Sequence, residues 1–345
     1  MLKEIIIEKI KNHGPIPFDE FMEIALYYPD LGYYTKPDTK IGRQGDFFTA
    51  SHLCSTFGFL LSKQIENFYH KLKCFEDFTI TEIGPGMGYL AKDILETLSI
   101  SVKYNLVEIN PSLIEIQKQN LNHYLDKTNW YKSIDKLSPF VGVFICNEVF
   151  DALPVRVFEI NTSTEMMEVY VDFKNDELTE TLLPCRDETR EYIEEFAPWI
   201  LKIKGYRSEV NLKMKSLIET LSEKFEKGYV LIFDYGYLAE EYYCSERKRG
   251  TLLCYYKHTI NENPYTNIGS QDITAHVNFT ALKKWAEDSG FECVGYFSQS
   301  NYLISLCDEK VLGEIYQKNL IQHFKRLVLP QGMGESHRVM ILSKT

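Results

Sequence analysis

A glycine-rich turn is the first segment of this chain whose residue types and spacing suggest chemistry. It follows the short β-branched run Thr79-Ile80-Thr81 and precedes a helix expected from about residue 88. Glycine is favoured where the backbone takes a positive φ or where a ligand approaches it closely. The free N–H groups at a helix start suit an anionic or carboxylate-bearing ligand. We expect this turn to bind a cofactor through Glu82, Gly84, Pro85, Gly86 and Gly88.

An acidic residue at the end of the next predicted strand completes a nucleoside site. Glu108 ends the run Tyr104 to Ile109, where a carboxylate can accept hydrogen bonds from both ribose hydroxyls. Dinucleotide sites prefer the pattern G-x-G-x-x-G, whereas this chain has G-x-G-x-G preceded two residues earlier by Glu82. The spacing therefore favours S-adenosyl-L-methionine over NAD, with Glu108 and Ile109 among the cofactor-binding residues.

Polar residues follow a third predicted strand, Val141 to Cys146. In an open α/β sheet the ligand lies outside the carboxyl ends of the strands, so these side chains can reach a transferred group. We expect Asn147 to contact the cofactor and Glu148 and Asp151 to contact the acceptor. The alternative is that Asn147 or Asp151 caps a following helix.

Three further segments supply candidate site residues. Asp46 and Thr49 lie in a loop before the sheet and are expected to bind the amino-acid end of the cofactor, although a simple Asp-stabilised turn is equally consistent. Asp234 ends a buried strand and His276 precedes an apolar helix, so we expect both to bind substrate. A strand-ending turn and a core histidine are the respective structural alternatives.

Strand and helix alternate through most of the chain, which is typical of a parallel sheet covered on both faces. A hairpin at 155–173 and helices near 187–199 and 207–226 interrupt the alternation. We expect an α/β fold with a mostly parallel sheet, an N-terminal cap at 1–72, and a main domain at 73–345 with a cap inserted at about 161–227. The other expected helices are two short ones within 1–28, on either side of 14–17, and those at 52–72, 88–98, 111–122, 279–289 and 308–327. The other expected strands are 78–83, 104–109, 141–146, 229–233, 291–297 and 338–343.

Composition excludes several other classes of protein. The formal net charge is −11, and nucleic-acid binding needs clustered cations, so we expect no nucleic-acid partner. The eight cysteines form no C-x-x-C pair, so we expect neither a metal site nor a disulfide framework. The chain has no signal-peptide pattern and no apolar run of roughly 20 residues. We therefore expect no membrane insertion and a location in bacterial cytoplasm, with the mitochondrial matrix as the alternative.

Taken together, the motifs resemble those of the MidA family of methyltransferases along nearly the whole chain. The departures are Thr259 after His258, Asn278, and Ser336-His337-Arg338 after Gly334, all outside the cofactor motif. The matching blocks are 14–16, 29–34, 45–49, 57–58, 82–88, 107–111, 147–155, 234–236, 249–252, Tyr255 with His258, 271–279 and 333–335.

The resemblance implies a class I, Rossmann-like methyltransferase fold with S-adenosyl-L-methionine as methyl donor. Through the mitochondrial member of the family, it also implies methylation of arginine on a protein such as a respiratory complex I subunit. Carboxylates hold a guanidinium by bidentate hydrogen bonds, which suits Glu148 and Asp151 as catalytic residues. The alternatives are a methyltransferase for a small molecule or RNA, and an assembly factor that binds the cofactor with little catalytic activity. The oligomeric state stays open.

Overall fold

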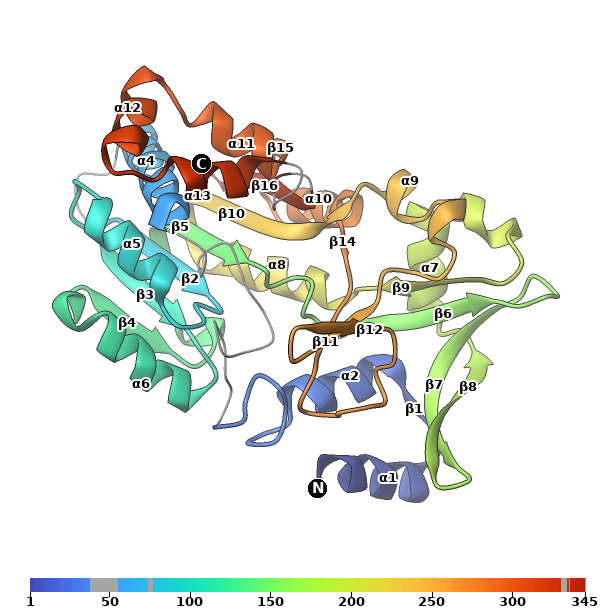
Figure 1. Ribbon diagram of the computed structural model, residues 1–345. Helices are drawn as coiled ribbons and strands as arrows, with labels where there is room; N and C mark the ends of the chain where they lie inside the picture. The colour runs from blue at the N-terminus through green and yellow to red at the C-terminus, as the bar shows by residue number, and fades with distance from the viewer. Residues whose placement is uncertain (38–54, 74–76, 330–333, 335, 345) are drawn as a thin grey trace. The chain divides into compact units, whose positions relative to one another are not determined.

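The computed structural model describes residues 1–37, 55–73, 77–329, 334 and 336–344 (Figure 1). The chain folds into two compact units whose segments alternate along the sequence. Unit 1 consists of Met1–Thr39, Phe150–Ser216 and Gly236–Leu282, and unit 2 consists of Lys40–Val149, Leu217–Tyr235 and Lys283–Thr345. These units divide the chain at other places than the predicted caps at 1–72 and 161–227, and a domain division at those bounds stays a prediction.

Unit 2 is built on a mixed sheet in which five neighbouring strands are parallel and one strand runs against them. The strands lie in the order β15 (Glu292–Ser298), β16 (His337–Lys344), β10 (Phe225–Tyr237), β5 (Phe140–Asn147), β2 (Thr79–Ile83), β3 (Lys103–Val107) and β4 (Thr128–Tyr131). Neighbours from β10 to β4 are parallel, whereas β16 is antiparallel to both β10 and β15. The carboxyl ends of β2, β3, β5 and β10 therefore meet at one edge of the sheet.

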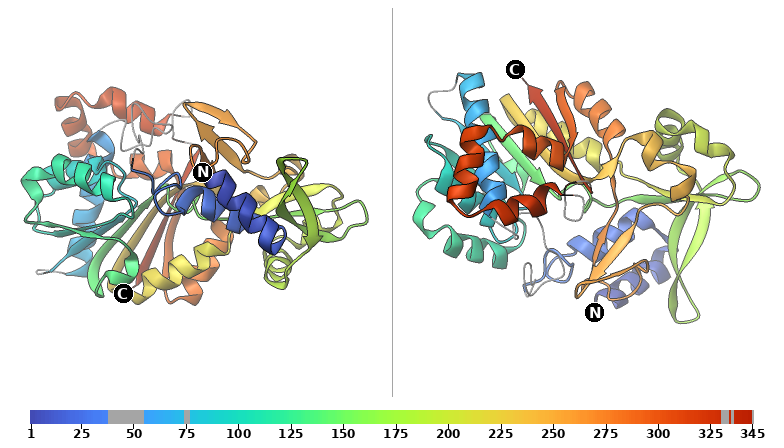
Figure 2. Two further views of the ribbon diagram at one scale, coloured as in Figure 1. Left: turned by 90° about the horizontal axis from the view of Figure 1, so that it is seen from below. Right: turned by 45° about the horizontal axis from the view of Figure 1, so that its top comes forward.

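Helices cover both faces of this sheet (Figure 2). The central strand β5 shows why: consecutive residues Val143, Phe144 and Ile145 point to alternate faces, yet all three are fully buried. A continuous apolar strand of this kind is typical of a sheet packed on two sides. The helices are α4 (Ser55–Leu72), α5 (Tyr89–Thr97), α6 (Pro111–Asn120), α11 (Gln299–Ser305), α12 (Glu309–Gln317) and α13 (Ile321–Val328), together with α8 (Lys213–Glu223) and α10 (Phe279–Asp288), which begin in unit 1.

Unit 1 contains two antiparallel sheets and the N-terminal helices. The larger sheet has the order β1 (Ile16–Pro17), β7 (Met166–Lys174), β6 (Arg156–Ile160) and β9 (Tyr206–Val210), with β8 (Glu177–Pro184) paired to β7. The smaller sheet has the order β12 (Thr259–Asn261), β11 (Leu253–Tyr256) and β13 (Asp272–Thr274). The helices are α1 (Leu2–His13), α2 (Phe18–Tyr27), α7 (Asp187–Phe196) and the short α9 (Ala239–Tyr242). The expected hairpin is confirmed, because β6 pairs with β7 antiparallel.

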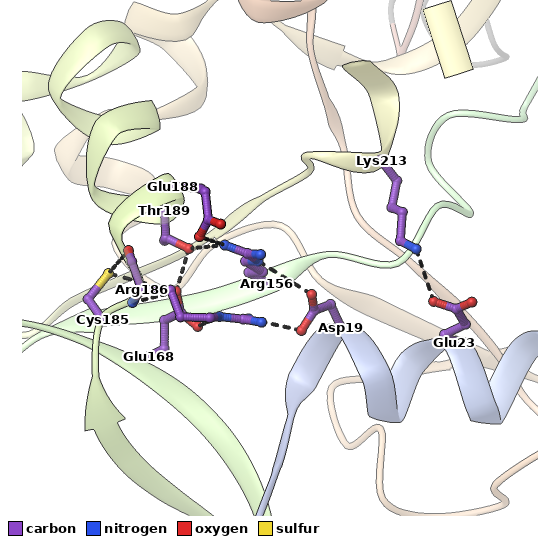
Figure 3. Close-up of polar contacts among 9 residues, drawn as sticks. All are labelled: Asp19, Glu23, Arg156, Glu168, Cys185, Arg186, Glu188, Thr189 and Lys213. Carbon is purple, nitrogen blue, oxygen red and sulfur yellow. Dashed lines mark hydrogen bonds and ion pairs between the residues drawn. The ribbon is translucent and has the colours of Figure 1, made fainter. Parts of the chain in front are cut away.

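A network of ion pairs fastens α2 to the larger sheet of unit 1 (Figure 3). Asp19 of α2 accepts from Arg156 at 3.4 Å and from Arg186 at 3.0 Å. Arg186 also donates to Glu168 on β7 at 2.6 Å, and the Thr189 hydroxyl donates to the same carboxylate. Glu168 is only 1% exposed, so its charge is compensated by groups of unit 1 itself.

Two predicted helices are wrong in part. The segment 207–226 begins in strand β9, which pairs antiparallel with β6. Ser208 and Glu209 are buried in this strand, and because both are polar, the sequence does not show the apolar alternation of a strand. The predicted helix 308–327 is two helices, α12 and α13, separated where Asn319 takes a left-handed φ of 57°. The strands β4 and β8 were not predicted.

Candidate active site

The glycine-rich turn joins β2 to α5 in a conformation that requires glycine. Gly84, Gly86 and Gly88 have φ values of 63°, 54° and 76°, a region that other residues enter only at a cost. The Gly84 N–H donates to the Val107 carbonyl at 3.0 Å, which ties the turn to the end of β3. Among the described residues, a Cβ at Gly84 would meet only Val149 Cγ2, at the ordinary contact distance of 3.8 Å.

Gln117 connects the glycine turn with Glu108. The Gln117 amide donates to the Gly86 carbonyl at 2.7 Å and to Glu108 Oε2 at 3.2 Å, and it accepts from Trp130 at 2.9 Å. The other Glu108 oxygen accepts from the Asn110 N–H at 2.8 Å. Sequence reasoning missed Gln117, because a glutamine on a helix gives no sign that it is buried. Burial raises the pKa of Glu108 to about 7, against the opposing effect of these hydrogen bonds.

The other cofactor residues predicted near this turn differ in their surroundings. Glu82 is 4% exposed and accepts from the Tyr104 hydroxyl at 2.8 Å, and burial raises its pKa to about 7. Ile109, which directly follows Glu108, is 42% exposed. Asn147 Oδ1 is buried and has no hydrogen-bond partner in the described part of the chain. Ile109 therefore presents an apolar side chain, and Asn147 an amide oxygen, that could contact a cofactor.

Glu148 is the most unusual residue of the site. Its backbone has a φ of 53°, a left-handed conformation that costs a residue with a Cβ roughly 1 kcal/mol. Its side chain is only 5% exposed, and neither carboxylate oxygen has a hydrogen-bond partner among the residues described. The Glu148 N–H donates to the Phe233 carbonyl at 2.8 Å, which holds the strained turn in place.

Asp234 within β10 and His337 at the start of β16 flank Glu148. The strand-ending turn considered for Asp234 is wrong, because β10 continues to Tyr237. Asp234 is fully buried and accepts from the Val149 N–H at 3.2 Å, so it fixes the turn that presents Glu148. His337 Nε2 lies 3.4 Å from Glu148 Oε1, and the His337 ring packs on Tyr235 with centroids 3.9 Å apart. His337 was not predicted as a site residue, because it is far from the other motifs in the sequence and only the pairing of β16 with β10 brings it here.

Asp151 and His276 belong to unit 1, in contrast to Glu148 and Asp234, which belong to unit 2. Asp151 is 3% exposed, and its carbonyl accepts from the Ala275 N–H at 3.0 Å. The His276 N–H donates to the Thr251 hydroxyl at 3.0 Å, and its ring lies 5.3 Å from that of Tyr237.

The helix-capping alternative for Asn147 and Asp151 is wrong, because β6 and not a helix comes next. The predicted cofactor residues Asp46 and Thr49 lie outside the described residues.

Residues 60–297 match the model of the family described as "Putative S-adenosyl-L-methionine-dependent methyltransferase". The chain belongs to this family, so the predicted family and methyl donor are confirmed.

Relatives and solved structures agree with this assignment. The chain is 28% identical to the mitochondrial protein arginine methyltransferase NDUFAF7 of Rattus norvegicus over 97% of its own length and 82% of that protein. It is 27% identical to the Danio rerio protein of the same name, over 96% and 84%. It also resembles the solved structure of a "likely methyl transferase" from Burkholderia thailandensis bound to S-adenosyl-homocysteine, with a TM-score of 0.88 and 26% identity over 99% of this chain and 92% of that one.

The described residues show neither a metal site nor a membrane-spanning helix. Among the described residues, no group of three or more His, Cys, Asp or Glu side chains is placed to hold a metal ion. No helix in that part of the chain is long and apolar enough to cross a membrane.

Proposed function

We propose that this protein transfers a methyl group from S-adenosyl-L-methionine to an arginine side chain of a protein, with a subunit of respiratory complex I as the candidate acceptor. The observation that carries the proposal is Glu148, a buried carboxylate with no hydrogen-bond partner among the described residues and a strained backbone. Burying such a charge costs several kcal/mol unless a partner compensates it, so a cationic ligand is the expected partner. The names of the NDUFAF7 relatives support arginine as that cation.

The cofactor is expected to lie over the glycine turn. We propose that the N–H groups at the start of α5 face its amino-acid end, while Glu108 accepts from the ribose and Ile109 and Asn147 contact the base. Asp46 and Thr49 stay predicted contacts. Glu82 also stays a predicted cofactor residue, although its bond from Tyr104 favours a role inside the sheet. The strand order, with β16 antiparallel, supports a class I, Rossmann-like arrangement.

When bound, the cofactor supplies an electrophilic methyl group on a sulfonium. The guanidinium is planar and matches a carboxylate through two parallel hydrogen bonds, so Glu148 would orient the guanidinium and offset its positive charge. The new N–C bond forms as the C–S bond breaks, and the nitrogen loses one proton. His337 Nε2, 3.4 Å from Glu148 Oε1, is placed to accept that proton in its neutral form. Asp234 acts by positioning the Glu148 turn, and Asp151 and His276 stay predicted acceptor contacts.

Quantitative mass spectrometry of arginine methylation, in cells with and without the gene, tests the proposal. We expect a small set of methylarginine sites to disappear on deletion and to return with the wild-type chain but not with Glu148→Gln. Unchanged methylarginine, together with tight S-adenosyl-homocysteine binding by the purified protein, would favour a cofactor-binding assembly factor. Methyl incorporation into RNA or a small molecule would identify a different acceptor.

The same cells would show where the protein acts. The relatives named above are mitochondrial by name, which agrees with the mitochondrial matrix as the alternative compartment. Location in bacterial cytoplasm stays a prediction.

A further inference from the structure

Two side-chain amides tie helix α6 to the glycine turn. Gln117 Nε2 donates to the Gly86 carbonyl at 2.7 Å, and Asn120 Nδ2 donates to the Met87 carbonyl at 2.9 Å. The two residues are three positions apart and therefore neighbours on one face of the helix. Gln117 makes a further contact, because its amide also donates to Glu108 Oε2 at 3.2 Å. The two amides thus support the same turn, but Gln117 also reaches the carboxylate expected at the ribose.

Trp130 on β4 fixes the orientation of the Gln117 amide. An indole N–H can only donate a hydrogen bond, and that of Trp130 donates to Gln117 Oε1 at 2.9 Å. Both N–H groups of the amide are therefore directed at acceptors, one on Gly86 and one on Glu108. Gln117 is fully buried, so a rotated amide would place an oxygen against these acceptors at a large cost in free energy.

Glu108 accepts a hydrogen bond from the protein on each of its carboxylate oxygens. Oε2 accepts from Gln117, and Oε1 accepts from the Asn110 N–H at 2.8 Å. Donors on both oxygens fix the plane of the carboxylate. Because an ionised carboxylate has about four lone-pair sites, a carboxylate held in this way can still accept from further hydroxyl groups.

We propose that Gln117 is a positioning residue for the cofactor ribose. By donating to Glu108 and Gly86 at once, it holds the carboxylate in the orientation that accepts from the ribose hydroxyls and keeps it in register with the glycine turn. The inference rests on the proposed contact between Glu108 and the ribose, and it is independent of the methyl acceptor. The structural alternative is that Gln117 only fastens α6 to the turn, as Asn120 does.

Calorimetry with two ligands separates these roles. The ligands are S-adenosyl-homocysteine and its 2′,3′-dideoxy analogue, which lacks both ribose hydroxyls, so the ratio of the two affinities reports the ribose contact. Hydrogen bonds to a charged acceptor are the stronger ones, and we expect wild type to prefer S-adenosyl-homocysteine by roughly a hundredfold. Gln117→Met keeps the length of the side chain but removes the donor to Glu108, and it should lower this ratio by about fivefold or more.

Asn120→Leu is the matched control variant. It removes the other amide that ties α6 to the turn, but leaves Gln117 and Glu108 in place. We expect it to weaken both ligands by the same factor, so that the ratio of affinities stays within about twofold of wild type. If Gln117→Met and Asn120→Leu lower the ratio equally, or if neither changes it, Gln117 only supports the turn and the proposal is overturned.

Trp130→Phe provides a second test that keeps Gln117 itself. The substitution removes the donor to Gln117 Oε1, which frees the amide to rotate away from Glu108. We expect the ratio of affinities to fall by about twofold to fivefold. If Gln117→Met does not fold, a wild-type ratio in Trp130→Phe would overturn the proposal.

Glu108→Gln distinguishes failure of this inference from failure of the ribose contact on which it rests. If this variant keeps the full wild-type ratio of affinities, Glu108 does not bind the ribose and both assignments fail. If it lowers the ratio while Gln117→Met does not, the ribose contact stands and the positioning role of Gln117 is overturned. In the double variant, Gln117→Met should add little to the effect of Glu108→Gln on the ratio, because it acts through that carboxylate. Additive losses would contradict that role.

Discussion

Two of the buried glutamate side chains, Glu168 in unit 1 and Glu148 in unit 2, have opposite surroundings. In unit 1, Glu168 is 1% exposed and accepts hydrogen bonds from the side chain and backbone of Arg186 and from Thr189. In unit 2, the Glu148 side chain is 5% exposed, has no such donor in the described structure, and stands on a left-handed backbone. The hydrogen bonds of Glu168 come from the protein itself. We expect those of Glu148 to come from a ligand.

This difference separates stability from function. A buried charge with internal partners holds elements together, and removing one partner leaves the other uncompensated. A buried carboxylate without hydrogen-bond donors, such as Glu148 with only His337 Nε2 at 3.4 Å, destabilises the free protein and makes the site complementary to a cation. Substitutions at the two glutamates should therefore affect different measurements.

Glu148→Gln should give the largest effect. The amide keeps the shape of the side chain but cannot neutralise a guanidinium, so we expect turnover to fall about a hundredfold or more, about 3 kcal/mol of transition-state stabilisation. Steady-state methylation kinetics would measure this loss. The melting temperature should stay unchanged or rise, because a buried charge is removed. Full turnover with unchanged cofactor affinity would contradict the assignment.

Glu168→Gln should instead destabilise the fold. The substitution removes the charged acceptor of Arg186 and Thr189, and breaking a buried pair from one side costs about 3 kcal/mol or more. Denaturant unfolding followed by circular dichroism would measure the change in the free energy of unfolding. The folded variant should bind the cofactor with the same affinity as wild type. A variant as stable as wild type would show that the network in Figure 3 does not hold α2 in place.

His337→Phe sharpens the assignment of the proton acceptor. Phenylalanine can keep the packing on Tyr235 but removes both ring nitrogens. We expect kcat to fall about tenfold to a hundredfold while KM for the acceptor changes little, since general-base contributions are of this order or larger. A change in KM alone, with kcat retained, would indicate that His337 only shapes the acceptor site.

The pH dependence of S-adenosyl-homocysteine binding tests Glu108. Its raised pKa of about 7 means that the carboxyl is neutral below pH 7 and charged above it. Because the charged form is the stronger acceptor for ribose hydroxyls, affinity should fall about tenfold from pH 8 to pH 6. Calorimetry at several pH values would measure the trend. Glu108→Gln should flatten it.

The sequence predicted the parts of the site that are local along the chain. The turn at Gly84 to Gly88 follows from glycine spacing, and Glu148 follows from its place after a buried strand. His337 could not be found in this way, because its approach to Glu148 depends on the pairing of β16 with β10. Gln117 was missed for a related reason, since only tertiary packing distinguishes a buried glutamine from an exposed one.

The predicted helix at 207–226 failed for a different physical reason. Glu209 and Ser208 are buried in β9, where the partners of Glu209 come from residues 242, 251 and 252. Polar residues that are buried because distant donors satisfy them do not show the alternation expected of a strand. Secondary structure is therefore mispredicted where hydrogen bonds from distant residues allow polar side chains to be buried.

The smallest effect is expected at Glu188, the exposed member of the network that contains Glu168. Glu188 pairs with Arg156 at 3.2 Å, but its side chain is 64% exposed, so water competes for both charges. Exposed pairs contribute between 0 and about 1 kcal/mol, and we expect Glu188→Gln to change the free energy of unfolding by less than about 0.5 kcal/mol. The same denaturation experiment used for Glu168 measures it. A loss of stability near that of Glu168→Gln would mean that the ion pairs are coupled through Arg156, which contacts both Glu188 and Asp19. A small loss would mean that the stabilisation comes mainly from the buried Glu168 carboxylate.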